Sequence, residues 1–138
     1  MIEIVKEDLR IRAISLYQPF ANNFYDGIKT IETRWHDTNI REDVLICSTK
    51  KPMIEPAGFG LCIVRLYNSR MLNPDDAKDA CCDYVPGKWA WETDRLRRLD
   101  PILPVTGRQG WFYVTIPAGT RLVHVDDLHP DYNEAGVH

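Results

Sequence analysis

The sequence IRAISLYQPFANNFYDGIKTIETRW, residues 11–35, decides the fold. Its first seven residues, 11–17, are mostly apolar and predict a buried strand. Pro19 then suits the first turn of a helix, where its missing N–H leaves no hydrogen bond unmade. Apolar side chains recur at the four-residue spacing of a helical stripe at Phe20, Phe24 and Ile28. Gly27 fits the left-handed position that ends such a helix, so we expect a buried strand followed by a helix of about two turns.

The end of this stretch, Thr30–Trp35, alternates with the period of a β-strand. The alternation puts Thr30, Glu32 and Arg34 on one face. In a cleft, the charges of Glu32 and Arg34 would be costly unless paired, and Lys29 is near enough to join them. Such a group could hold a phosphate or a base edge, or activate a water molecule by acid–base action. Spacing alone leaves open an exposed strand with weak surface ion pairs.

The rest of the chain predicts more short strands and one more helix. A helix starts at Asn73, where a capping Asn, a proline and acidic residues follow one another. The proline- and glycine-rich segment 50–60 reads as a loop, and Pro101 and Pro104 should break the chain. Further strands are expected at 43–48, 61–67, 88–93, 111–116 and, as a short edge, 122–125. We therefore expect the α+β class, with five to seven strands in a small closed or nearly closed β-barrel and two short helices.

Composition bounds the class of protein. The chain has 138 residues, 44% of them hydrophobic and 27% charged, which predicts one globular domain and excludes global disorder. Apolar runs fall short of the roughly 18–20 residues of a membrane span, and the N-terminus is acidic where a signal peptide would be basic. We expect a soluble, cytoplasmic protein with no membrane partner. A net charge of −3 argues against indiscriminate binding to nucleic-acid backbones.

The acidic residues are unevenly distributed along the chain. Residues 126–138 contain four acidic residues and no Lys or Arg, so they read as an acidic C-terminal tail beyond a single domain at 1–125. The tail and the acidic stretch Asp75–Asp83 could serve a protein partner. A pure protein-interaction module is therefore one hypothesis for the function of this chain.

The cysteines give no sign of a metal site. They are Cys47, Cys62 and the adjacent pair Cys81–Cys82, with no Cys-x-x-Cys, and the histidines add no metal-ligand spacing. We interpret the cysteines as reduced structural thiols, and we expect no metal and no cofactor.

Several of these motifs together resemble the ASCH domain family, which is related to the PUA RNA-binding fold. The resemblance rests on Ile14-Ser15-Leu16, on Gln18-Pro19 and on Gly27-x-Lys29-x-x-Glu32-x-Arg34, and it extends over roughly residues 12–116. It implies a PUA-like barrel, with residues 1–125 as one ASCH domain. The cleft of that barrel would be lined by the first helix and by the Lys–Glu–Arg strand.

The resemblance favours a binding module for RNA, single-stranded nucleic acid or a modified nucleoside. Lys29 and Arg34 would contact phosphate or a base acceptor, and Glu32 would accept from an exocyclic amine. Tyr17 or Trp91 could stack on a base, although core packing of Trp91 is the plainer interpretation. The expected ligand-binding residues are Ser15, Gln18, Lys29, Glu32, Arg34, Ser48 and Trp91.

A hydrolase is the alternative, so whether the protein is an enzyme stays open. Some small ASCH proteins remove the acetyl group of N4-acetylcytidine with a lysine, a nucleophilic threonine and a later glutamate, and others are reported to cut RNA. Lys29 matches that lysine, but Glu32 stands where the threonine would be. If the chain is an amidohydrolase or ribonuclease, Lys29 and Glu32 would be catalytic, with Glu32 a general base on water. Glu92 and Asp83 are candidates for the later glutamate.

Overall fold

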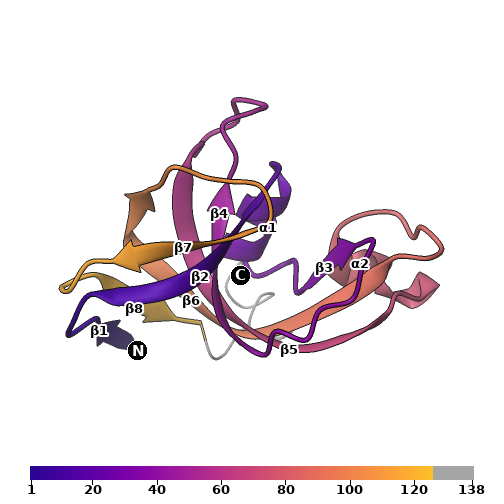
Figure 1. Cartoon of the computed structure of the whole chain (residues 1–138), viewed down its shortest axis with the longest axis horizontal. Helices are drawn as coiled ribbons and strands as arrows, with labels where there is room; N and C mark the ends of the chain where they lie inside the picture. The colour runs from indigo at the N-terminus through magenta and orange to yellow at the C-terminus, as the bar shows by residue number, and fades with distance from the viewer. Residues whose placement is uncertain (126–138) are drawn as a thin grey trace, which may run out of the picture.

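A long antiparallel ribbon of two strands organises the fold. The computed structural model describes residues 1–125, and its two longest strands are β5 (Phe59–Met71) and β6 (Trp89–Pro104). They sweep along the lower edge of the molecule in Figure 1. One end of β6 also pairs with β3 (Ile31–Arg34), and the other end pairs with β8 (Arg121–His124). The ribbon therefore connects two wings of the structure.

The remaining strands extend the sheet on both sides of the ribbon. They are β1 (Ile2–Ile4), β2 (Leu9–Leu16), β4 (Glu42–Ser48) and β7 (Trp111–Ile116). The order is β1-β8-β6-β5-β4-β2-β7, with β3 branching from β6. Strands β2 and β4 pair in parallel, and every other pairing in residues 1–125 is antiparallel.

The sheet is open, which corrects the predicted barrel of five to seven strands. Residues 1–125 form eight strands and two short helices, so the α+β class is confirmed. Strand β1 pairs with β8 and β7 pairs with β2, and within the described residues no ladder joins β1 to β7. These two strands are therefore free edges.

The core lies on both faces of the sheet because β4 is buried on both sides. Val44 and Ile46 pack in the cluster that contains Phe24 of α1 (Phe20–Tyr25), whereas Leu45 and Cys47 face a second cluster. Two-sided burial explains why the middle of β4, Val44–Cys47, is a continuous apolar run rather than an alternating one. Cys47 and Cys62 are both 0% exposed, as expected of structural thiols, and burial raises the pKa of Cys47 to about 12.

The helices follow the sequence signals but are shorter than expected. Helix α1 ends at Tyr25, and Gly27 takes the predicted left-handed conformation at φ 82°. Ile28 therefore lies beyond the helix and is exposed rather than part of its apolar stripe. Asn73 caps a 3-10 turn, η1 (Pro74–Asp76), that continues into α2 (Ala77–Ala80).

Pro101 does not break the chain, contrary to expectation. It lies inside β6, between the Cys62–Arg98 and Gly60–Leu103 pairs, where the register with β5 shifts. Pairing with β8 has already ended at Asp100, so the missing N–H of the proline disturbs no ladder there.

The predicted acidic tail, 126–138, lies outside the described residues. Within residues 1–125, no helix has the length and apolar character needed to cross a bilayer.

Candidate functional site

A two-lobed cleft opens where β2 and β3 approach the loops after β4 and β6. The larger lobe has a volume of about 670 Å³ and the smaller lobe one of about 400 Å³. Both lobes are lined by Ser15, Tyr17 and Arg34, so the lobes adjoin along these three residues. These volumes are in the range of pockets that hold small ligands.

The three charged residues singled out from the sequence converge in the smaller lobe. The Nζ atom of Lys29 lies 3.5 Å from Oε1 of Glu32, and Nε of Arg34 lies 2.9 Å from Oε2. The exposed fraction of the side chain rises across these three residues, from 1% for Lys29 through 14% for Glu32 to 29% for Arg34. The glutamate therefore has a cation on each oxygen, and Arg34 is the member that solvent reaches most easily.

Local structure explains how a lysine can be buried here. After the turn at Gly27 the chain passes beside α2, and Nζ of Lys29 donates a 2.5 Å hydrogen bond to the carbonyl oxygen of Ala80. The ammonium also lies 5.1 Å from the ring centre of Phe20 and 5.5 Å from that of Phe24. A carbonyl, a carboxylate and two aromatic faces replace the water that the ammonium has lost.

Positive charge dominates the cleft although the chain as a whole carries −3. Among the described residues that line the two lobes, Glu32 is the one acidic residue. The lysines and arginines number five: Lys29, Arg34, Lys50, Lys88 and Arg108. Lys50, Lys88 and Arg108 were not predicted as site residues, because the loops that carry them meet the cleft only in the folded chain.

Two exposed aromatic side chains stand at the smaller lobe. Tyr17 is 66% exposed and Trp35 is 64% exposed. Nζ of Lys88 lies 5.1 Å from the ring centre of Trp35, which is a cation–π contact. Large rings that stay in solvent beside cations are the arrangement on which nucleic-acid bases stack.

The model of the ASCH domain matches residues 14–116. The chain belongs to the ASCH domain family. Membership of this PUA-like family supports a nucleic-acid-related function at the level of the family. No curated protein matches the chain.

Solved ASCH structures share the fold. The crystal structure of ASCH from Zymomonas mobilis is 14% identical, covers 75% of this chain and 86% of its own, and has a TM-score of 0.59. Two mutant proteins of the same ASCH, each 13% identical over 75% of this chain, have TM-scores of 0.59 and 0.52 and are covered over 88% and 87% of their length. At these identities the likeness concerns the fold alone.

Two of the residues expected to contact a ligand, Gln18 and Ser48, form hydrogen bonds to the main chain of this ASCH domain. Oε1 of Gln18 accepts from the N–H of Asn22 in α1, and Nε2 donates to the carbonyl of Pro56. The Oγ atom of Ser48 accepts from the N–H of Phe59 at 3.1 Å. Gln18 is 5% exposed and lines neither lobe, whereas Ser48 lines the larger lobe.

Trp91 is also placed in the core rather than in either lobe. It is 3% exposed, its ring stacks on Trp111 at a centroid distance of 5.7 Å, and its Nε1 donates to the carbonyl of His36. The guanidinium of Arg34 lies 5.6 Å from the Trp91 ring, so this tryptophan supports the wall from which Arg34 projects.

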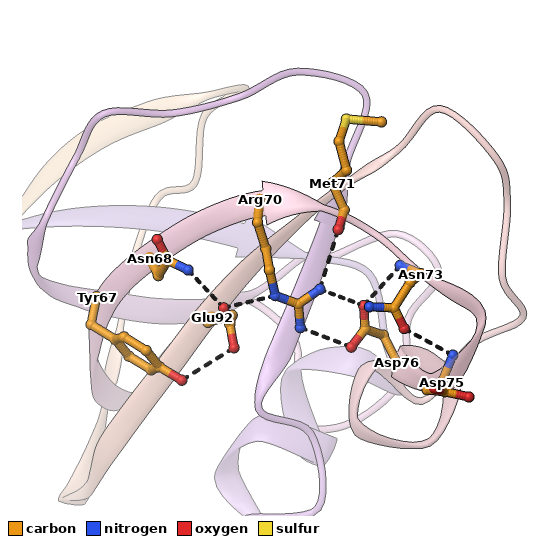
Figure 2. Close-up of polar contacts among 8 residues, drawn as sticks. All are labelled: Tyr67, Asn68, Arg70, Met71, Asn73, Asp75, Asp76 and Glu92. Carbon is orange, nitrogen blue, oxygen red and sulfur yellow. Dashed lines mark hydrogen bonds and ion pairs between the residues drawn. The ribbon is translucent and has the colours of Figure 1, made fainter.

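Glu92, a candidate for a later catalytic glutamate, belongs to a different cluster. It points to the face of β6 opposite Trp91, and Figure 2 shows it bound by Asn68, Tyr67 and Arg70. Arg70 bridges Glu92 to Asp76 in η1, with Nη1 2.7 Å from Oδ2 of Asp76. Neither Glu92 nor Asp83 lines the cleft.

The Arg70 cluster fixes η1 and α2 to the long ribbon. The hydrogen bond from Arg70 lowers the pKa of Asp76, against the opposing effect of burial. Because α2 supplies the carbonyl that accepts the hydrogen bond of Lys29, this cluster helps to hold Lys29 in place at the smaller lobe.

No group of His, Cys, Asp and Glu side chains suited to a metal occurs in the described part of the chain.

Proposed function

We propose that this ASCH domain binds single-stranded nucleic acid, RNA in the first place, in the two-lobed cleft. One observation carries the proposal: five cations and one carboxylate line a cleft beside two exposed aromatic rings, on a chain of net charge −3. Cations that neutralise phosphates and rings that stack on bases are the two parts of single-strand recognition.

The cations that line the cleft differ in how easily a ligand can contact them. Lys29 is buried and is held by Ala80 and Glu32, so we expect it to add to the positive electrostatic potential of the smaller lobe rather than to contact a phosphate directly. Lys50 and Arg108 are exposed on two different loops at the larger lobe. We assign the direct phosphate contacts to Lys50 and Arg108 and to the solvent-facing side of Arg34.

The local nature of the positive charge sets the size of the ligand. Three cations with accessible charge, Arg34, Lys50 and Arg108, line the larger lobe, so we expect contact with a few phosphates rather than a long duplex. Logarithmic affinity for a single strand should fall with logarithmic salt concentration with a slope of about −0.7 for each phosphate neutralised. A slope of about −2 is expected, because three cations are assigned to phosphates.

Hydrolysis remains a second candidate because Lys29 and Glu32 are in contact within the smaller lobe. A lysine–carboxylate pair beside a pocket can move a proton between a bound water and a leaving group. Incubation with N4-acetylcytidine, followed by chromatography for cytidine and acetate, tests this candidate. Product that disappears in both Lys29→Met and Glu32→Gln would assign the pair a catalytic role.

The binding proposal is tested by fluorescence anisotropy with a short labelled RNA of mixed sequence. We expect saturable binding that weakens about tenfold or more in the double variant Lys50→Ala, Arg108→Ala. The double variant Lys6→Ala, Arg121→Ala removes two exposed cations that line neither lobe and is the matched control. Absence of RNA binding, or an equal loss in the control, would contradict the proposal.

A further inference from the structure

We propose that the two lobes divide a single ribonucleotide, with its phosphate in the larger lobe, its base in the smaller lobe and its ribose at Ser15. This inference rests on the proposed function and names the unit that the cleft recognises. In a nucleotide the sugar lies between phosphate and base, so a ligand that spans both lobes puts its sugar where they adjoin. Ser15, Tyr17 and Arg34 mark that junction.

The larger lobe has the chemistry of a phosphate site. Its described lining contains Arg34, Lys50 and Arg108 and no Asp or Glu. Thr49 and Thr106 also line this lobe. An anion with several acceptor oxygens fits such a lining, because no carboxylate of the described residues lines this lobe and the nearby Glu32 occupies only the Nε side of Arg34.

The smaller lobe has the chemistry of a base site. Three of its lining residues are aromatic, namely Tyr17, Phe20 and Trp35. Its polar edge is the Glu32–Arg34 pair, which presents a carboxylate acceptor and a guanidinium donor side by side at 2.9 Å. A flat heterocycle with both donor and acceptor atoms on its edge matches this combination of faces and edge.

Ser15 supplies the observation that points to a ligand. Its Oγ atom has less than 1 Å² of exposed surface and has no hydrogen-bond partner among the described residues. A buried hydroxyl without a partner destabilises the folded state, so its presence at this position calls for a role in binding a ligand. The 2′-hydroxyl of ribose, which both donates and accepts, would give Oγ its partner and would distinguish RNA from DNA.

The loop after β6 controls access to this hydroxyl. A Cβ atom at Gly107 would lie 2.8 Å from Oγ of Ser15, so glycine lets the loop approach this closely. Residues 106–110 are all exposed. Ligand entry therefore involves an outward shift of this loop from Ser15.

Calorimetric titration of the full chain with mononucleotides tests the inference. The probes are the four ribonucleoside monophosphates, as 5′ and 3′ isomers, with the matching nucleosides and 2′-deoxynucleotides. We expect at least one ribonucleotide to bind, its nucleoside to bind about tenfold more weakly, and its deoxynucleotide about fivefold more weakly. Ser15→Ala should reduce ribonucleotide affinity to the deoxynucleotide level without lowering the unfolding midpoint.

The outcomes separate this inference from the proposed function. Equal affinity for nucleoside and nucleotide would overturn the phosphate lobe, and equal affinity for ribo- and deoxynucleotide would overturn the role of Ser15. If the labelled RNA binds while no mononucleotide does, the inference is wrong and the proposed function stands. If the RNA does not bind either, both are wrong.

Discussion

The ammonium of Lys29 is bonded to the carbonyl oxygen of Ala80, 51 residues further along the chain, at 2.5 Å. This contact joins the segment that leads into β3 to α2, and the N–H of Thr30 reinforces it by donating to the carbonyl of Asp79. The lysine that begins the Lys–Glu–Arg group is thus part of the architecture of the smaller lobe. Its loss should be visible in stability as well as in binding.

Lys29→Met should destabilise the fold by about 3 kcal/mol. The substitution leaves the carbonyl of Ala80 without its donor and removes one cation from the partly buried Glu32. Urea denaturation measures the change. Lys78→Met, at an exposed position of α2, is the matched control and should change stability by no more than about 0.5 kcal/mol. Equal stability of the two variants would show that the buried contact contributes nothing.

Asp76→Asn should be most destabilising at neutral pH and progressively less so in acid. Arg70 holds the pKa of Asp76 below its usual value, so the folded state favours the ionised carboxylate. That stabilisation is present above about pH 4 and is lost as the pH falls through the lowered pKa. Thermal unfolding between pH 7 and pH 3 should show the gap between wild type and variant closing. A gap independent of pH would refute the assignment.

Local sequence patterns were sufficient to predict the strands and the helix around the site. They were not sufficient to predict which distant loops complete the lining of the site. Alternation placed Glu32 and Arg34 on one face, and their 2.9 Å ion pair agrees with that placement. Arg108 could not be assigned, because its loop reaches Ser15 across more than 90 residues. Local patterns also could not predict that the sheet stays open, because closure depends on whether the two edge strands β1 and β7, which are distant in sequence, pair with each other. Gln18 was predicted to face a ligand, but whether an amide turns to ligand or to main chain depends on the loop at Pro56.

Gln18→Ala should loosen the β4–β5 connection, which projects from the top of the view in Figure 1. The substitution removes the donor to Pro56 and leaves the N–H of Asn22 without its side-chain acceptor. Hydrogen–deuterium exchange should rise in peptides covering residues 50–58, because local opening governs exchange there. Gln109→Ala, at an exposed position of the other loop, is the control and should leave those peptides unchanged.

Thiol labelling should divide the four cysteines into two classes. Cys47 and Cys62 are fully buried and burial raises the pKa of both, so neither forms a thiolate at neutral pH. Cys81 and Cys82 are half-buried free thiols. Peptide mapping after treatment with a maleimide should find label on Cys81 or Cys82 in the native protein and on all four cysteines in urea. Native labelling of Cys47 would contradict this burial pattern.

Gly107→Ala and Ser15→Ala should compensate for each other. Alone, Gly107→Ala brings a methyl group to 2.8 Å from Oγ of Ser15 and should destabilise the fold by about 1 kcal/mol. Alone, Ser15→Ala should be neutral or stabilising by about 1 kcal/mol, because it removes a buried hydroxyl that has no partner among the described residues. With Oγ gone, the nearest remaining atom to the new methyl is Cβ of residue 15 at 3.8 Å, an ordinary contact. Urea denaturation of the four proteins in the double-mutant cycle should therefore give a coupling energy of about 1 kcal/mol. Strict additivity would mean that the loop does not lie against Ser15 in solution.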